Sequence, residues 1–186
     1  MSAPTFNITE TNGAGPTGTS TTITQISFAS VDLASTGASS AANPVPQNQN
    51  SFEKWLRLQI ATVATNAISG VTVFFNGTAP TDSAASGATI SRFFGLNGTY
   101  ATPVATTSTV AITNCTTQVT APGPAVTNFA SNTANLYTGY VTMQYRLGAA
   151  AGGNAILANP EITWQYVWSS LALAFLSVHV FIGLLG

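Results

Sequence analysis

The sequence predicts an all-β protein with a β-sandwich fold, of the jelly-roll or another Greek-key type. Several short segments alternate apolar and polar residues with the period of two that half-buried strands show. Turn-forming groups such as Asn97-Gly98 and Pro122-Gly123-Pro124 separate these segments. No long amphipathic helical pattern occurs. About seven or eight strands at this short spacing are typical of a sandwich.

The predicted strands can be followed in order along the chain. Residues 21–31 form a β-prone run with Ile26 and Phe28 on one face. Residues 55–63 give the clearest pattern, because three apolar residues there alternate with Arg57, Gln59 and Ala61. The remaining predicted strands are residues 70–76, 88–96, 99–104, 108–117, 137–147 and 161–167.

The two ends of the chain differ in composition from its middle. Residues 1–20 are rich in Gly, Thr and Ser and predict an extended N-terminal arm, followed by a sandwich domain over residues 21–167. Residues 168–186 form an apolar C-terminal tail. We rank three interpretations of this tail: burial against other subunits first, a membrane-anchoring helix second, and a strand that continues the sandwich edge third. The apolar run is short of the roughly 20 residues that a bilayer-spanning helix needs.

Low charge limits the functions open to this protein. Only 5% of its 186 residues are charged, and the net charge is −1. No basic patch exists that could collect nucleic acid, so we expect no nucleic-acid partner. A weakly charged surface favours association, so we expect a homo-oligomer within an assembly. The polar start of the chain also predicts no secretory signal peptide.

The residues that usually carry chemistry are few and scattered. The one histidine, His179, lies in the apolar tail, and the one cysteine is Cys115. No spacing suggests a metal site, a catalytic triad or a paired-carboxylate site. We therefore predict a protein that is not an enzyme, with no catalytic, cofactor-binding or metal-binding residues. The five acids are expected in solvated or edge-protecting places.

One local charge cluster opens the clearest predicted strand. Glu53, Lys54 and Arg57 lie close together in the sequence. The preferred interpretation is a solvated entrance to the strand. The alternative is an ion pair between subunits.

Aromatic and aliphatic residues suggest possible subunit contacts. Phe74-Phe75 and Phe93-Phe94 are adjacent pairs, and neighbours in a strand face opposite sides of the sheet. One ring of each pair is therefore expected outside the core, where it could meet another subunit. The candidate contact residues are Phe74, Phe93, Leu171, Phe175 and Phe181.

Three segments carry a resemblance to a known group of proteins. Ser51–Leu58 (SFEKWLRL), Thr99–Thr106 (TYATPVAT) and Ile162–Tyr166 (ITWQY) resemble patterns of small, β-rich structural proteins of tailed bacteriophages. The similarity spans residues 20–167, and its motifs are structural. In the proteins it resembles, the chain ends soon after the Trp-Gln-Tyr element. The tail of residues 168–186 departs from that pattern.

The resemblance implies a virion component made in the host cytoplasm. Within that class we expect a capsid cement (decoration) protein at the capsid surface, whose partners are the major capsid protein and copies of itself. One alternative is a tail, neck or fibre-associated protein that could bind carbohydrate by stacking it on Trp and Tyr residues of the strand faces, with Trp55 and Trp164 as the residues to test. Another is a membrane-anchored protein held by residues 167–186.

Overall fold

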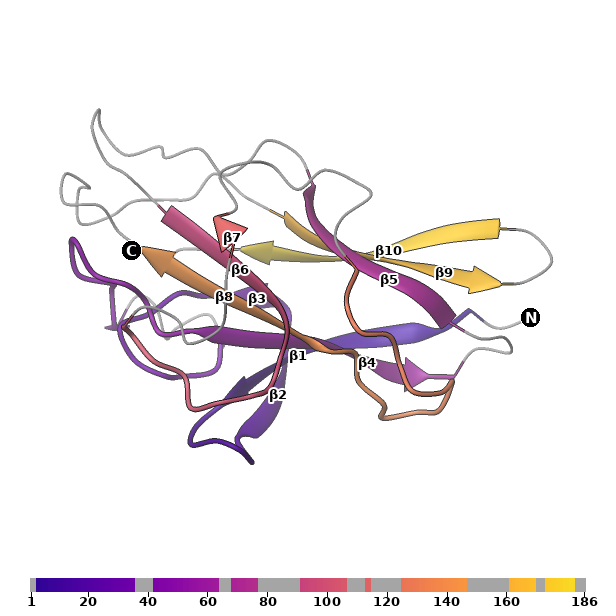
Figure 1. Cartoon of the computed structure of the whole chain (residues 1–186), viewed down its shortest axis with the longest axis horizontal. Helices are drawn as coiled ribbons and strands as arrows, with labels where there is room; N and C mark the ends of the chain where they lie inside the picture. Colours follow the sequence, from indigo (N-terminus) through magenta and orange to yellow (C-terminus); the bar gives the residue numbers. More distant parts are fainter. Residues whose placement is uncertain are drawn as a thin grey trace.

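The described chain consists of β-strands joined by loops, as Figure 1 shows. The computed structural model describes residues 3–35, 42–63, 68–76, 91–106, 113–114, 125–146, 161–169 and 173–182. Its regular elements are the strands β1 to β10, paired mainly antiparallel into two sheets. The all-β class predicted from the alternating pattern is thus confirmed.

The first sheet has six strands in the order β2-β1-β4-β8-β6-β7. Their bounds are β2 Thr19–Ile23, β1 Thr5–Asn12, β4 Lys54–Thr62, β8 Tyr140–Arg146, β6 Ser91–Gly98 and β7 Thr113–Asn114. All of its pairings are antiparallel. Strands that are neighbours in this sheet, such as β1 and β4, can be far apart in sequence, with β2 and β3 between them along the chain.

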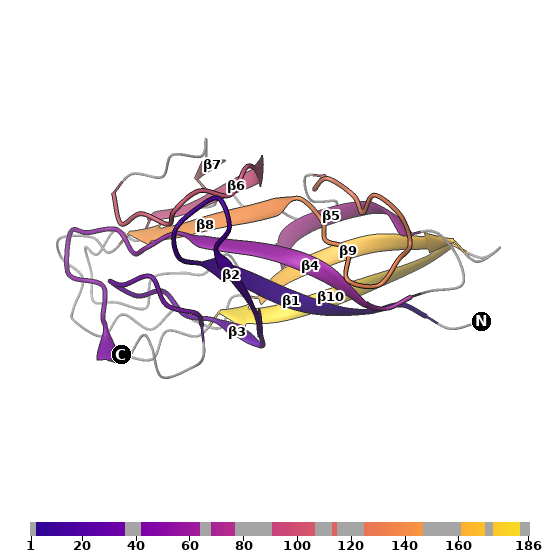
Figure 2. The same ribbon diagram turned by 90° about the horizontal axis from the view of Figure 1, so that it is seen from below.

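The second sheet has four strands in the order β3-β10-β9-β5. Their bounds are β3 Gln25–Ile26, β10 Leu173–Ile182, β9 Glu161–Ser169 and β5 Ile68–Asn76. β10 pairs antiparallel with β9 and parallel with the short β3. In Figure 2 the strands of both sheets run along the long axis of the molecule.

Both sheets contribute side chains to one hydrophobic core. β4 supplies Leu56, Leu58 and Ile60, while β9 supplies Trp164 and Tyr166, all of them buried. The alternation predicted for residues 55–63 is confirmed, since Arg57 and Gln59 lie on the opposite face and are less buried. This pattern places the core between the two sheets.

The opposite face of the first sheet is covered as well. Gln144 of β8 is buried there and donates hydrogen bonds through Nε2 to the carbonyls of Val104 and Thr106, at 3.2 and 2.6 Å. Residues 99–104 were predicted as a strand but run as an irregular segment over this face. The covering contacts explain the difference, because they satisfy the backbone without a ladder.

The N-terminus departs from the predicted arm. Thr5–Asn12 is strand β1, which lies between β2 and β4 inside the first sheet. Its inward side chains include Phe6 and Ile8, which pack on the common core. The polar composition of residues 1–20 hid this strand, because Thr and Asn occupy the outer positions of the alternation.

The C-terminus also departs from the preferred prediction. Leu173–Ile182 is strand β10, flanked by β9 and β3 within the second sheet. Of the three interpretations of the tail, the strand is the one that the structure shows. Val178 packs against the core of its own chain. Within the described ranges there is no helix long and apolar enough to span a membrane.

Candidate functional site

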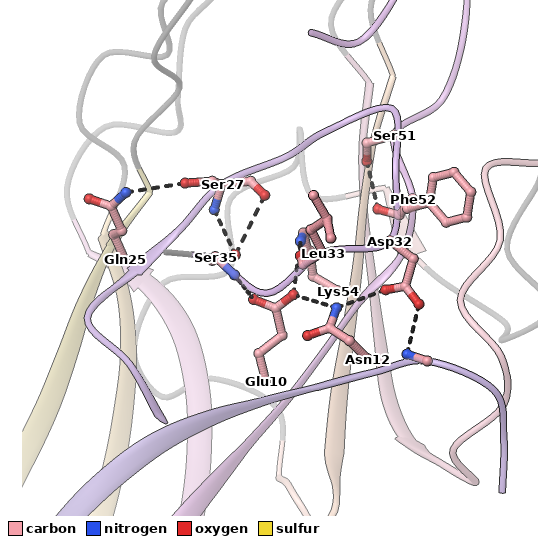
Figure 3. Close-up of polar contacts among 11 residues, drawn as sticks. Glu10, Asn12, Gln25, Ser27, Asp32, Leu33, Ser35, Ser51, Phe52 and Lys54 are labelled. Atoms are coloured by element: carbon pink, nitrogen blue, oxygen red, sulfur yellow. Dashed lines mark hydrogen bonds and ion pairs between the residues drawn. The ribbon is translucent and has the colours of Figure 1, made fainter. Parts of the chain in front are cut away.

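A buried ion pair is the most unusual polar feature of the core. Lys54 Nζ lies 2.8 Å from Glu10 Oε1, and both side chains have an exposed fraction of 0%. Figure 3 shows the pair among its polar neighbours. Lys54 stands at the start of β4 and Glu10 near the end of β1. The pair therefore ties two adjacent strands of the first sheet together.

The alternation of each strand explains why these charges point inward. Glu10 lies two residues after the core residue Ile8, and Lys54 lies two residues before the core residue Leu56. Side chains two residues apart in a strand share a face. Both charges are thus carried into the end of the core by the same pattern that buries their apolar neighbours.

The segment of residues 27–35 covers the pair and satisfies it. Lys54 Nζ also donates to the carbonyl of Leu33 at 2.7 Å, and the backbone N–H of Ser35 donates to Glu10 Oε2 at 3.0 Å. The N–H of Ser27 in turn donates to Ser35 Oγ at 3.0 Å. A buried charge is tolerated only when such bonds replace its water. The cluster therefore fixes this loop onto the sheet.

A second carboxylate and an amide extend the cluster. Asn12 Nδ2 donates to Glu10 Oε1 at 2.9 Å and to Asp32 Oδ1 at 2.8 Å. Asp32 Oδ2 also accepts from the backbone N–H of Gly13 at 2.7 Å. Asn12 Oδ1 is buried and accepts no hydrogen bond from the described residues. The cluster thus places an amide between two carboxylates and next to a lysine, which are groups that can react with one another or exchange protons.

The prediction of a solvated strand entrance is wrong for two of its three residues. Glu53 and Lys54 are fully buried, and Glu53 Oε2 accepts from Trp55 Nε1 at 3.1 Å. The ion pair of Lys54 lies within the chain instead of between subunits. Sequence reasoning missed its partner Glu10 because that residue was assigned to an arm. The inward phase of Glu10 with Phe6 and Ile8 was the signal that could have found it.

An aromatic cluster lies on the outer face of the first sheet. The rings of Tyr100 and Tyr140 each pack edge-on against Trp55, with 5.5 Å between centroids. Tyr100 Oη donates to the carbonyl of Gly13 at 2.6 Å. Burial, then the charge of Asp32 and the neighbouring Tyr140, raise the pKa of Tyr100 to about 12. The phenol is therefore neutral at physiological pH.

The two tryptophans proposed for sugar stacking do not face solvent. Trp55 and Trp164 both have an exposed fraction of 0%. Arg57 is only partly buried, and its guanidinium carbon lies 4.1 Å from the ring centre of Tyr137 and 4.3 Å from that of Tyr140. Any ligand stacking on this face would therefore meet Arg57 and its two tyrosines.

The predicted subunit-contact residues are spread over both sheets. Phe74 is partly buried on β5, and Phe93 pairs with Asn114 and Gln144 along β6. Phe175 and Phe181 lie in β10, while Leu171 is outside the described residues. Their role as subunit contacts therefore stays a prediction.

Of the two other residues considered for chemistry, the structure describes one. His179 lies in β10 opposite Thr163, and Cys115 is outside the described residues. Among the residues that the structure describes, no three His, Cys, Asp or Glu side chains group as metal ligands would. The Glu10–Lys54–Asn12–Asp32 cluster is thus the candidate site.

Comparison with known proteins adds no family to this description. No protein-family model matches the chain, and no curated protein sequence matches it. A functional proposal therefore has to start from the residues and their geometry.

Proposed function

We propose that this protein is a non-enzymatic virion component, a capsid cement protein that bridges major-capsid subunits of a tailed bacteriophage. The observation that carries the proposal is where the few charges lie. Glu10, Glu53 and Lys54 are fully buried, in a chain with only five acids and four basic residues. These three charges lie in the interior, so only six of the nine charged residues are left for the rest of the chain. Depletion of charge is characteristic of surfaces buried in interface cores.

The architecture supports a mechanical role. Two sheets around one core, with sequence-distant strands as neighbours, support a β-sandwich of Greek-key or jelly-roll type. The exposed Thr and Ser residues of the edge strand β2 can hydrogen-bond to a neighbouring subunit without charge repulsion. We expect each contact to bury about 1,600 Å² or more, the usual size of a stable interface.

The proposal is tested by the copy number of the chain in purified, DNA-filled particles. Quantitative mass spectrometry against the major capsid protein should give a ratio near one to one, or a simple fraction of it. The isolated protein should also bind expanded heads. Absence from particles, or recovery only in tail fractions, would overturn the proposal.

One observation favours a second candidate, a tail or fibre protein that binds carbohydrate. The partly exposed stack of Arg57 with Tyr137 and Tyr140 could hold an acidic sugar by ring stacking and a charge-assisted hydrogen bond. A glycan-array signal lost in Tyr137→Ala and kept in Thr17→Ala, an exposed position, would support this candidate. A few copies per particle would agree with it, whereas a shell-wide ratio would not.

A further inference from the structure

We propose that Lys54 and Asn12 are the reactants of an intramolecular isopeptide bond, with Glu10 as the group that transfers the proton. The product would join β1 to β4 by an amide between the two side chains. This inference rests on the cluster alone and holds whether or not the protein belongs to a capsid.

The strand register brings the two reacting side chains together. β1 and β4 are antiparallel, and the last pair of their ladder is Thr11 with Trp55. Extending this register by one residue places Asn12 opposite Lys54 on the same face of the sheet. Directly opposed residues have Cβ atoms about 4.5–5.5 Å apart. A lysine side chain spans such a distance easily.

Hydrogen bonding already converges on one oxygen between the reactants. Glu10 Oε1 accepts from Lys54 Nζ at 2.8 Å and from Asn12 Nδ2 at 2.9 Å. The attacking nitrogen and the leaving nitrogen therefore both touch the same carboxylate oxygen. A general base that can later act as a general acid needs this placement.

The surroundings exclude water and leave the amide carbonyl unengaged. Lys54 and Glu10 are fully buried, which shields the attacking amine and its base from water. Asn12 Oδ1 is buried and takes no hydrogen bond from any described residue. Asp32 holds Asn12 Nδ2 from the other side at 2.8 Å. Reaction requires rotation of this amide until its Cγ comes about 3–3.5 Å from Nζ.

The proposed reaction balances without any added reagent. Glu10 takes a proton from the Lys54 ammonium, and the neutral Nζ attacks Asn12 Cγ to give a tetrahedral intermediate. Glu10 returns its proton to Nδ2 as the Cγ–Nδ2 bond breaks. An Nζ–Cγ amide forms that keeps one proton on its nitrogen, and the second Nζ proton leaves with the ammonia molecule as ammonium, so Glu10 ends as a carboxylate again. Nothing is oxidised or reduced.

A competing reaction at Asn12 also releases ammonia and must be separated from this one. Asn12 precedes Gly13, and the Gly13 backbone nitrogen could attack Cγ to form a succinimide. In the structure that N–H donates to Asp32 Oδ2 at 2.7 Å. The succinimide needs no lysine and leaves the peptide linear after hydrolysis.

The test is intact-mass spectrometry of the folded full chain, followed by peptic digestion. We expect a mass lower than the sequence mass by one ammonia, and one branched peptide joining residues 12 and 54. Asn12→Ala should show its full mass while it keeps the Lys54–Glu10 pair. Glu10→Gln should slow or abolish the loss. Asn7→Ala, on the opposite face of β1, is the matched control and should still lose ammonia.

Two results would overturn the proposal. One is a folded wild-type protein that keeps its full sequence mass. The other is a loss of ammonia that persists in Lys54→Met and yields only linear peptides with aspartate or isoaspartate at position 12. If Lys54→Met does not fold, the digest of the wild-type protein still separates the two reactions, because only the isopeptide bond gives a branched peptide joining residues 12 and 54.

Discussion

At the scale of single residues, the effect of a buried charge on the stability of the fold depends on whether its partner remains in place. Lys54 and Glu10 are fully buried, and each also bonds to the segment of residues 27–35. Removing one member leaves the other buried without a counter-charge, which is far more costly than losing an exposed pair.

This difference predicts the effect of substitutions at the pair. In an Asn12→Ala background, where no isopeptide bond can form, Lys54→Met should lower the free energy of unfolding by about 3–5 kcal/mol. Adding Glu10→Leu should recover much of that loss, because no unpaired charge then remains. Urea unfolding of the three proteins measures both steps. A further loss of stability when Glu10→Leu is added to Lys54→Met would contradict a coupled pair.

A second residue-scale prediction concerns pH and Tyr100. Its pKa is about 12 in the folded chain against the usual 10.0 for a tyrosine, because burial disfavours the phenolate. The resulting stabilisation is complete below pH 10. Between pH 10 and 12 the unfolded chain loses this proton first, so the free energy of unfolding should fall as pH rises.

The comparison protein for this prediction is Tyr100→Phe, which lacks the titrating group. Its stability should depend less on pH across that window, although Tyr166 keeps a pKa that burial also raises. Chemical unfolding at several alkaline pH values measures the difference. Identical pH slopes for the two proteins would show that the Tyr100 phenol is not shielded in the folded state.

At the scale of elements, the two ends of the chain are structural strands. β1 lies between β2 and β4, and β10 lies between β9 and β3. A strand inside a sheet satisfies the hydrogen-bonding groups of two neighbours, so its loss leaves two unpaired edges. The ends are therefore parts of the folded core and should not be dispensable.

This placement predicts that deletion of residues 168–186 unfolds the protein. The truncated chain would lose β10 and expose the edge of β9, together with buried surface around Trp164. Near-ultraviolet circular dichroism and urea unfolding report the loss. Removing only residues 183–186, beyond the end of β10, is the control and should leave the fold intact. A folded, soluble truncation at 168 would contradict the role of β10.

At the scale of the whole molecule, stability should depend little on salt. Only 5% of residues are charged, and the Lys54–Glu10 pair is shielded from solvent. Salt screens exposed charges strongly and buried pairs weakly. The melting temperature should therefore shift by only a few degrees between about 0.05 and 1 M NaCl, as scanning calorimetry can measure. A large decrease at high salt would mean that surface charges stabilise the fold.

The sequence by itself determined the all-β class and the inward-facing side of the clearest strand. Leu56, Leu58 and Ile60 alternate with polar residues, and a period of two is readable without any partner. It also placed β8, since Val141, Met143 and Tyr145 are buried on one face as the pattern indicates. Alternation involves only neighbouring residues of one strand, so it can be recognised in the sequence without knowing which strands pair.

Only the tertiary structure decided what each strand pairs with and which charges meet. Glu10 and Lys54 are 44 residues apart, and no local pattern links them. The polar β1 and the apolar β10 were misjudged because their composition resembles an arm and a tail, whereas pairing with β4 and β9 makes them strands. Strand partners are chosen by long-range burial and hydrogen bonding. The ion pair, its loop and the reactive arrangement at Asn12 exist only because those distant strands come together.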